Sequence, residues 1–340
     1  MKRRGRLQKT QLPGRPQGIG GGHGLPALPT EAKPVDVVGL GENSLDLVAV
    51  APRFPSPDSK QVLNRLSSLV GGQTATALVA CARLGWRARY LGGIGDDEAG
   101  RRVMEALGGE GVDVAVRSRP GASTRRAIIV VDARTGRRAV LEHRDPTVAL
   151  GPDDLDSGLV TSGRVLLIDA RDPTVSVAAA LMARAAGVPI VLDVEEPTPG
   201  VEELLRLVDV IVATASFPTA LTGVRAIGAA VARLADASGS AVVIATLGPQ
   251  GSLARLGGRE VRTPGFRVKA VDTTGAGDAF RGGLIAGWLG AGPATQAATV
   301  LEYANAVAAL NCLGFGAQAG LPTRSEVEAF VTRVRRDQSK

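Results

Sequence analysis

The chain has 340 residues, of which 44% are hydrophobic and 21% are charged, a balance that provides for a sizeable core and excludes wholesale disorder. No apolar run approaches the roughly 18 residues of a membrane-spanning helix, so we expect no membrane partner. The two cysteines form no CxxC pattern, which excludes a disulfide scaffold and a zinc knuckle and favours a cytoplasmic setting.

The net charge of +7 is concentrated at the start of the chain. Residues 1–33 hold seven of the 40 basic and one of the 33 acidic residues, which leaves 33 basic and 32 acidic residues in the remainder. Residues 1–33 also contain seven glycines and four prolines without a periodic apolar pattern, so we expect a disordered basic tail. Because the remainder is balanced and aromatic residues make up only 3%, nucleic acid is not expected as a partner.

A single folded domain is expected over residues 34–335, followed by a short tail at 336–340. In chain order, its first half predicts strands at 35–40 and 45–51, a helix at 74–84, a strand at 88–92, a helix at 98–107, and a hairpin of 126–132 with 138–142. Its second half predicts strands at 165–170, 189–194, 208–214 and 241–247, helices at 175–186 and 201–207, two short helices after residue 214, and long helices at 276–290, 293–312 and 323–335. Apolar strands that alternate with amphipathic helices predict a doubly wound α/β fold with a mostly parallel sheet covered on both faces.

Three familiar nucleotide-binding patterns do not fit this sequence. None of the six lysines follows a glycine-rich loop in the frame GxxxxGK[ST], which excludes a P-loop. The triplet His143-Arg144-Asp145 resembles a protein-kinase HRD motif, but Leu150 stands where that motif requires Asn. A dinucleotide-binding motif that starts at Gly39 would need glycine in place of Ser44, so a tight turn is the simpler interpretation.

The segment 271–280, VDTTGAGDAF, has the pattern of an anion site at the start of a helix. Gly275, Ala276 and Gly277 are small enough for a phosphate to approach the backbone, and the free N–H groups and the helix dipole favour negative charge. Asp278 beside them is placed to accept a proton from a hydroxyl that attacks a phosphoryl group. The alternative is an aspartate that only stabilises the helix start, and spacing alone leaves both interpretations open.

This segment resembles the second signature, DTxGAGDxF, of the ribokinase (PfkB) carbohydrate-kinase family. The resemblance covers 34–330 and leans towards the ketohexokinase branch. Further matching motifs are GENSLD at 41–46, GGQTAT at 71–76, GDDEAG at 95–100, TLGPQG at 246–251 and PGFRV at 264–268. The resemblance implies a ribokinase-like fold with a small β lid from segments near 45–65 and 122–143. It also implies MgATP-dependent phosphorylation of a sugar hydroxyl.

The resemblance assigns roles to individual residues. It makes Asp278 the general base and residues 275–277 the anion hole. The substrate-binding residues would be Asp46, Gly72, Gln73 and Thr76. The ATP-binding residues would be Thr246, Gly248, Gly251, Thr274 and Asn305. A monovalent cation such as K⁺ would lie at Asp272, Thr274 and Gly316.

Two positions depart from the family pattern. Thr76 stands where the sugar loop usually has Asn, and TASF at 214–217 replaces the NxxE motif that helps to organise magnesium in many members. Asp193 and Glu195 follow a predicted strand, at the edge where open α/β sheets bind ligands. Since Mg²⁺ prefers a few carboxylates together with waters and phosphates, both are candidates for the missing ligand.

The expected function is therefore that of an ATP-dependent sugar kinase that dimerises through its lid. Because a carboxylate can accept hydrogen bonds from two vicinal hydroxyls, Asp46 favours an unphosphorylated ketose or pentose. Arg144 and Arg171 are the residues that would clamp a sugar phosphate, although a surface ion pair is the preferred interpretation of each. The alternatives are a nucleoside or phosphosugar kinase of the same fold and a non-catalytic sugar-binding regulator whose tail binds nucleic acid. Few aromatic residues disfavour the nucleoside kinase, and the intact GAGD disfavours the regulator.

Overall fold

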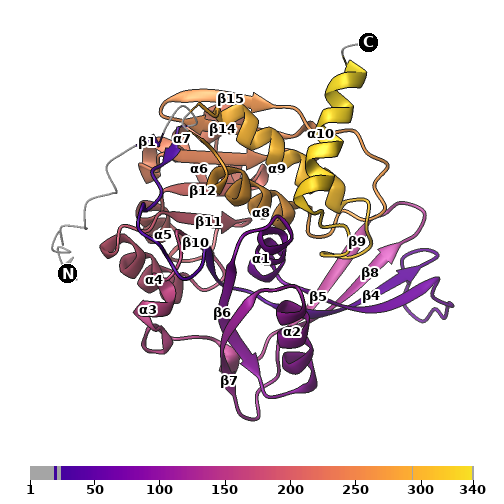
Figure 1. Cartoon of the computed structure of the whole chain (residues 1–340). Coiled ribbons are helices and arrows are strands. Elements are labelled where there is room, and N and C mark those ends of the chain that lie inside the picture. Colours follow the sequence, from indigo (N-terminus) through magenta and orange to yellow (C-terminus); the bar gives the residue numbers. More distant parts are fainter. Residues whose placement is uncertain (1–18, 21–23, 293, 339–340) are drawn as a thin grey trace, which may run out of the picture.

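The computed structural model describes residues 19–20, 24–292 and 294–338, and a nine-stranded sheet runs through its centre (Figure 1). In spatial order the strands are β15 (Arg259–Thr263), β14 (Ser252–Leu256), β13 (Val242–Thr246), β12 (Val210–Thr214), β11 (Ile190–Val194), β10 (Val165–Asp169), β3 (Val37–Leu40), β6 (Ala88–Gly95) and β7 (Asp113–Arg119). Each pair of neighbouring strands from β13 to β7 is parallel. Strand β14 is antiparallel to β13, and β15 is antiparallel to β14. The predicted mostly parallel sheet is confirmed, and β7, β14 and β15 are additions to it.

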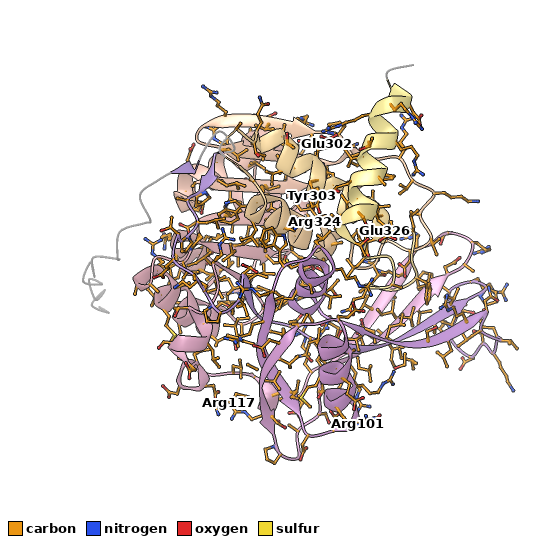
Figure 2. All side chains as sticks on the ribbon, viewed as in Figure 1. Arg101, Arg117, Glu302, Tyr303, Arg324 and Glu326 are labelled. Carbon is orange, nitrogen blue, oxygen red and sulfur yellow. The ribbon has the colours of Figure 1, made fainter. Side chains whose placement is uncertain are left out.

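Helices cover both faces of this sheet. One face carries α1 (Gln73–Arg83), α2 (Glu98–Gly109), α8 (Ala276–Leu289), α9 (Ala297–Asn311) and α10 (Arg324–Gln338); the other carries α3 (Ser157–Val160), α4 (Pro173–Ala185), α5 (Val201–Leu207), α6 (Ser216–Thr222) and α7 (Ile227–Ser238). Successive strand side chains point to opposite faces, so Val191 packs with the first group of helices and Leu192 with the second. Their packed side chains fill the space between the layers (Figure 2).

A second sheet of four strands projects from the body as a lid (Figure 1). Its order is β5 (Arg65–Gly71), β4 (Ser44–Ala51), β8 (Arg126–Asp132) and β9 (Arg138–His143), and only the β4–β8 pair is parallel. On one face Val48, Ala127 and Ile129 are buried and pack with Phe315. Because β4 starts shortly after β3 and β5 leads into α1, the lid is anchored where the central strand β3 ends.

Both ends of the described chain depart from the expected tails. Strand β1 (Ile19–Gly20) pairs with β2 (Leu25–Pro26), Leu25 is 2% exposed, and the Trp288 indole donates a hydrogen bond to the Pro26 carbonyl oxygen at 3.2 Å. A disordered tail is therefore wrong from Leu25 onward, because apolar residues there pack on α8. Residues 1–18 and 21–23 lie outside the described residues.

At the other end, α10 continues to Gln338, so residues 336–338 of the expected C-terminal tail are helical. Near its start, Arg324 Nε donates to the Leu84 carbonyl oxygen at 3.1 Å (Figure 2). Within the ranges that the structure describes, no helix combines the length and the hydrophobicity needed to cross a bilayer.

Candidate active site

The start of α8 supplies a set of free backbone donors. Gly275 precedes the helix with a φ of 74°, a conformation that favours glycine, and a Cβ there would collide with the backbone of Ala317. The chain turns sharply into α8. The Ala276 N–H donates to the Thr273 carbonyl oxygen at 3.3 Å, whereas the N–H groups of Gly277 and Asp278 have no acceptor among the described residues. Such a terminus attracts anions, which is the geometry that an anion hole at 275–277 requires.

Asp278 lies in the first turn of α8, and its side chain is 13% exposed. Burial, together with the charges of Glu195 and Glu42, raises its pKa to about 7, although the guanidiniums of Arg281 and Arg138 act in the opposite direction. Arg281 Nη1 lies 3.4 Å from Asp278 Oδ1. A carboxyl group whose pKa is near neutrality is well matched to accepting a proton at physiological pH.

Asp193, one of the two predicted magnesium ligands, is paired with a buried arginine. At the end of β11 it is 2% exposed and forms an ion pair with Arg281, which is 1% exposed. Gly277 makes room for this arginine, since a Cβ at that position would lie 2.5 Å from Arg281 Nη1. Asp193 therefore holds Arg281 in place beside Asp278. Glu195, two residues further on, is half-buried and is the other predicted metal ligand.

Asp46 enters the site from the lid strand β4. Its carboxyl group is 8% exposed, and burial raises its pKa. Two glycines pass close to it: a Cβ at Gly71 would collide with the Asp46 carboxylate, and Gly72, with a φ of 97°, lies against the backbone of Asn43. The lid and the glycine turn before α1 thus enclose this carboxylate, and only residues without a side chain fit the turn.

The two other predicted sugar-binding residues lie on α1. Gln73 begins the helix and is partly exposed. Thr76 has no exposed surface, and its hydroxyl accepts a hydrogen bond from Gln318 Nε2 at 3.3 Å. A contact between Thr76 and the sugar stays a prediction, since the hydroxyl that accepts from Gln318 still has a proton to donate.

A cavity of about 490 Å³ lies between the end of β13, the loop 265–270 and the helices α8 and α9. Its lining includes four of the residues predicted to bind ATP, together with apolar side chains: Thr246, Gly248, Gly251, Asn305, Phe266, Phe280 and Cys312. Asn305 Nδ2 donates to the carbonyl oxygens of Thr263 and Pro264 at 3.4 Å each, which ties the loop to α9. Thr274 does not line this cavity, but its neighbour Thr273 does.

The three residues predicted to surround a monovalent cation lie together beside the start of α8. One oxygen of the Asp272 carboxylate accepts hydrogen bonds from the backbone and the hydroxyl of Thr274 at 2.9 and 2.8 Å, and the other accepts from the Gly316 N–H at 2.9 Å. Asn311 Nδ2 donates to the Thr274 carbonyl oxygen at 3.2 Å. These bonds join the loop before α8 to the loop after α9.

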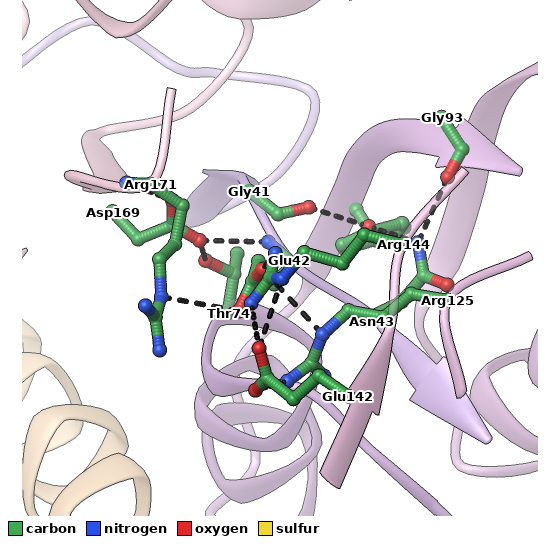
Figure 3. A network of polar contacts seen from close by, with 11 residues as sticks. Gly41, Glu42, Asn43, Thr74, Gly93, Arg125, Glu142, Arg144, Asp169 and Arg171 are labelled. Atoms are coloured by element: carbon green, nitrogen blue, oxygen red, sulfur yellow. Dashed lines mark hydrogen bonds and ion pairs between the residues drawn. The ribbon is translucent and has the colours of Figure 1, made fainter. Parts of the chain in front are cut away.

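Arginines from separate segments converge on Glu42, in the loop between β3 and β4 (Figure 3). Arg144 forms an ion pair with Glu42, and the Nε atoms of Arg125 and Arg171 lie 3.6 and 3.5 Å from its carboxylate oxygens. Glu142 on β9 accepts hydrogen bonds from Arg125 and Arg144. The sequence singled out Arg144 and Arg171, but it contains no signal for Arg125 or Glu42 as their partners.

A further arginine, which sequence reasoning did not identify, reaches the start of α8 from the lid. Arg138 begins β9, and its Nη1 donates to the hydroxyl groups of Thr274 and Thr273 at 3.1 and 3.5 Å. The predicted hairpin placed this residue at the start of a returning strand, which is the one signal for its position. The structure thus brings a lid guanidinium to the proposed anion hole.

Comparisons with known proteins agree with this arrangement. Residues 35–324 match the family described as pfkB family carbohydrate kinase. A ribokinase of Haemophilus influenzae is 29% identical over 306 residues, covering 86% of this chain and 97% of its own. An ATP-dependent ribose-1-phosphate kinase of Halopiger xanaduensis is 31% identical over 303 residues, covering 88% and 98%.

Among solved structures, a ribokinase of Arabidopsis thaliana complexed with ribose and ATP has a TM-score of 0.75 at 25% identity, covering 87% of this chain and 98% of its own. A ribokinase of Thermotoga maritima has a TM-score of 0.74 at 25% identity, covering 88% and 99%. The fold is ribokinase-like, and the chain belongs to the PfkB family of carbohydrate kinases, which are phosphotransferases.

Proposed function

We propose that this kinase transfers the γ-phosphoryl group of ATP to a hydroxyl group of a small sugar, with Asp278 as the general base. The observation that carries the proposal is a carboxyl group with a pKa of about 7 in the first turn of α8, next to backbone N–H groups that have no acceptor within the helix. A base and an anion hole side by side suit transfer of a phosphoryl group to a hydroxyl.

ATP binds with its base in the cavity lined by Thr246 and Asn305 and its γ-phosphate at the start of α8. The substrate hydroxyl gives its proton to the Asp278 carboxylate while its oxygen forms a bond to the γ-phosphorus. The bond from that phosphorus to the bridging oxygen breaks, and ADP leaves. The N–H groups of 275–277 and the Arg138 guanidinium stabilise the negative charge on the transferred group.

Glu195 is the residue that fits a magnesium ion at this site. It is half-buried, and its charge acts on Asp278, whereas Asp193 is taken up by Arg281. Mg²⁺ is commonly held by one or two carboxylates together with waters and substrate phosphates. Bound Mg²⁺ would neutralise charge on the ATP phosphates.

Asp46, with Gly72 and Gln73 beside it, is proposed to hold the hydroxyl groups of the sugar. The names of the relatives support a small sugar as the substrate, since they include a ribokinase, a ribose-1-phosphate kinase and a fructokinase, and the Arabidopsis ribokinase was solved with ribose and ATP. These names leave both a neutral and a phosphorylated sugar open.

A monovalent cation is proposed beside the anion hole, in the loop of Asp272, Thr274 and Gly316. The hydrogen bonds that join these residues hold the loop before α8, and a cation on the loop's backbone oxygens would fix it further before ATP binds. Higher rates in potassium than in sodium buffer at equal ionic strength are expected. Equal rates would count against this cation.

An ADP-coupled assay over neutral sugars, sugar phosphates, sugar acids and nucleosides tests the proposed reaction. Asp278→Asn should lower kcat by about 10²–10⁴-fold, while calorimetry shows unchanged ATP binding. Glu196→Gln is the matched control, because this carboxylate is exposed and lies outside the site. Near-normal turnover of Asp278→Asn would remove the residue from the role of base, and turnover of nucleosides alone would correct the substrate class.

A further inference from the structure

We infer that the cavity beside Glu42 is a subsite for an anionic group of the substrate, a phosphate ester or a carboxylate, bound by Arg144, Arg171 and Arg125. The cavity has a volume of about 380 Å³ and is lined by these arginines and by the glycines 41, 92 and 93. The inference rests on the proposed function for the identity of the rest of the substrate, a sugar. It replaces the sequence-based expectation of an unphosphorylated sugar.

The three arginines come from elements on different sides of the cavity. Arg125 immediately precedes β8, Arg144 follows β9, and Arg171 follows β10 (Figure 3). The first two belong to the base of the lid, whereas Arg171 belongs to the body. A ligand held by all three would therefore bridge the lid and the body, at the carboxyl end of the sheet where open α/β folds bind ligands.

The ion pairs within this cluster leave donors unused. Arg171 is 36% exposed, its Nε approaches Glu42 no closer than 3.5 Å, and its side chain donates no hydrogen bond within the described residues. Arg144 is 40% exposed, but its three nitrogens already donate to Glu42 and Glu142, and the Nε of Arg125 is buried without a hydrogen-bond partner among those residues. Arg171 therefore supplies the open donors of the cluster. Guanidinium groups with free N–H donors bind phosphates and carboxylates through paired hydrogen bonds.

An anion here would be bound by directed N–H donors and not by net charge. Three guanidiniums face the two carboxylates of Glu42 and Glu142, and three further carboxylates line the cavity. The other acids that line the cavity accept donors elsewhere: Asp145 binds the N–H groups of residues 123 and 147, Asp169 those of 42 and 171, and Asp172 those of 174 and 175. None of these three forms an ion pair with an arginine of the cluster.

The cluster lies within electrostatic reach of the reaction. The charge of Glu42 raises the pKa of Asp278. The Leu45 N–H, next to Asp46, donates to the Arg125 carbonyl oxygen at 3.1 Å, which puts this arginine beside the proposed sugar site. One substrate can then place hydroxyl groups at Asp46 and an anionic group at the arginines. Such a site would discriminate against the neutral sugar, because the arginines would lose partners that only the anion supplies.

Calorimetry on the full chain tests the subsite directly, with the nucleotide site filled by a non-hydrolysable ATP analogue. The probes are ribose, ribose 5-phosphate, gluconate and inorganic phosphate, and the variants are Arg171→Ala, Arg171→Lys and Arg144→Gln. We expect the wild type to bind at least one anionic probe, and Arg171→Ala and Arg144→Gln each to weaken it by about tenfold or more, with a smaller loss for Arg171→Lys. Binding of ribose should change less than twofold.

Arg126→Ala is the matched control, because this neighbour of Arg125 is 51% exposed and pairs with Asp97 outside the cavity. Absence of anion binding by the wild type, or anion binding that survives both arginine substitutions, would overturn the subsite. Turnover of neutral sugars by a wild type that binds no anionic probe would overturn the subsite and leave the kinase reaction standing. Arginine-dependent anion binding without any phosphoryl transfer would uphold the subsite and reject the proposed reaction.

Discussion

At the scale of single residues, Asp278 links burial to catalysis. Its pKa of about 7 lies above that of an exposed aspartate because the carboxylate is buried near Glu195 and Glu42. A base must be deprotonated to work, so kcat/KM should rise with pH and level off above about pH 7, with a tenfold loss for each pH unit below that value. A pH–rate profile measures this, and a plateau that extends down to pH 5 would show a base with an ordinary pKa.

Arg138 offers a second test at this scale, with its neighbour Arg137 as the control. Arg138 contacts the loop before α8, while the exposed Arg137 makes no side-chain contact to that loop. Arg138→Ala should lower kcat by about 100-fold or more, since an arginine on the transferring group contributes about 10³–10⁵ in other phosphoryl-transfer enzymes. KM for the sugar should change little.

The pH profile separates this role from a purely structural one. Arg138 lowers the pKa of Asp278, so its removal should move the rising limb of the profile to higher pH. Arg137→Ala should leave both kcat and the limb unchanged. If Arg138→Ala lowered the rate but left the rising limb of the pH–rate profile unshifted, the guanidinium would not act on the charge of Asp278.

At the scale of elements, burial on both faces decides which strands could be predicted. β10, β11, β12 and β13 are continuous apolar runs because helices cover both of their faces. β5 and β15 lie at sheet edges, and their arginine- and serine-containing sequences have no clean apolar period. The resemblance to the family implied a lid, but the apolar pattern missed the strand that forms its edge.

The lid also presents an exposed apolar row. Leu47, Ile128 and Leu141 are cross-strand neighbours on β4, β8 and β9, with exposures of 39%, 48% and 61%. We propose that the same row of a second copy covers it, in the homodimer that the family resemblance implies. Ile128→Asp with Leu141→Asp should then shift the protein to monomers in sedimentation velocity, whereas Leu181→Asp on α4 should not. Monomers in the wild type at micromolar concentration would contradict this.

At the scale of the whole molecule, local patterns explain which parts of the site could be predicted. Asp278 and Gly72 lie in short motifs, so the sequence alone is enough to identify them. Arg125 and Arg171 carry no motif, and Glu42 lies in GENSLD, a motif that does not point to arginine partners. The three residues lie on separate segments, so only the tertiary fold brings them together. The inferred anionic substrate rests on these arginines. Because the sequence does not show that they meet, it favoured a neutral sugar.

The segment before β3 links chain organisation to stability rather than to catalysis. Composition predicted a disordered tail up to residue 33, yet Leu25 is buried and the Pro26 carbonyl oxygen accepts a hydrogen bond from Trp288 in the last turns of α8. Asp278 lies ten residues earlier on this helix, about 15 Å away along its axis. Removing the segment should therefore act on stability and spare the site.

A chain that starts at Lys33 should lose about 1.5–3 kcal/mol of unfolding free energy from the burial of Leu25, and unfold at lower urea concentration than the full chain. Its kcat/KM should stay unchanged. A chain that starts at Ile19 keeps β1 and β2 and is the control, with the stability of the full chain. If the chain that starts at Lys33 kept its unfolding free energy, the burial of Leu25 would contribute nothing to stability. If that chain lost activity at equal stability, the segment would act on the active site itself.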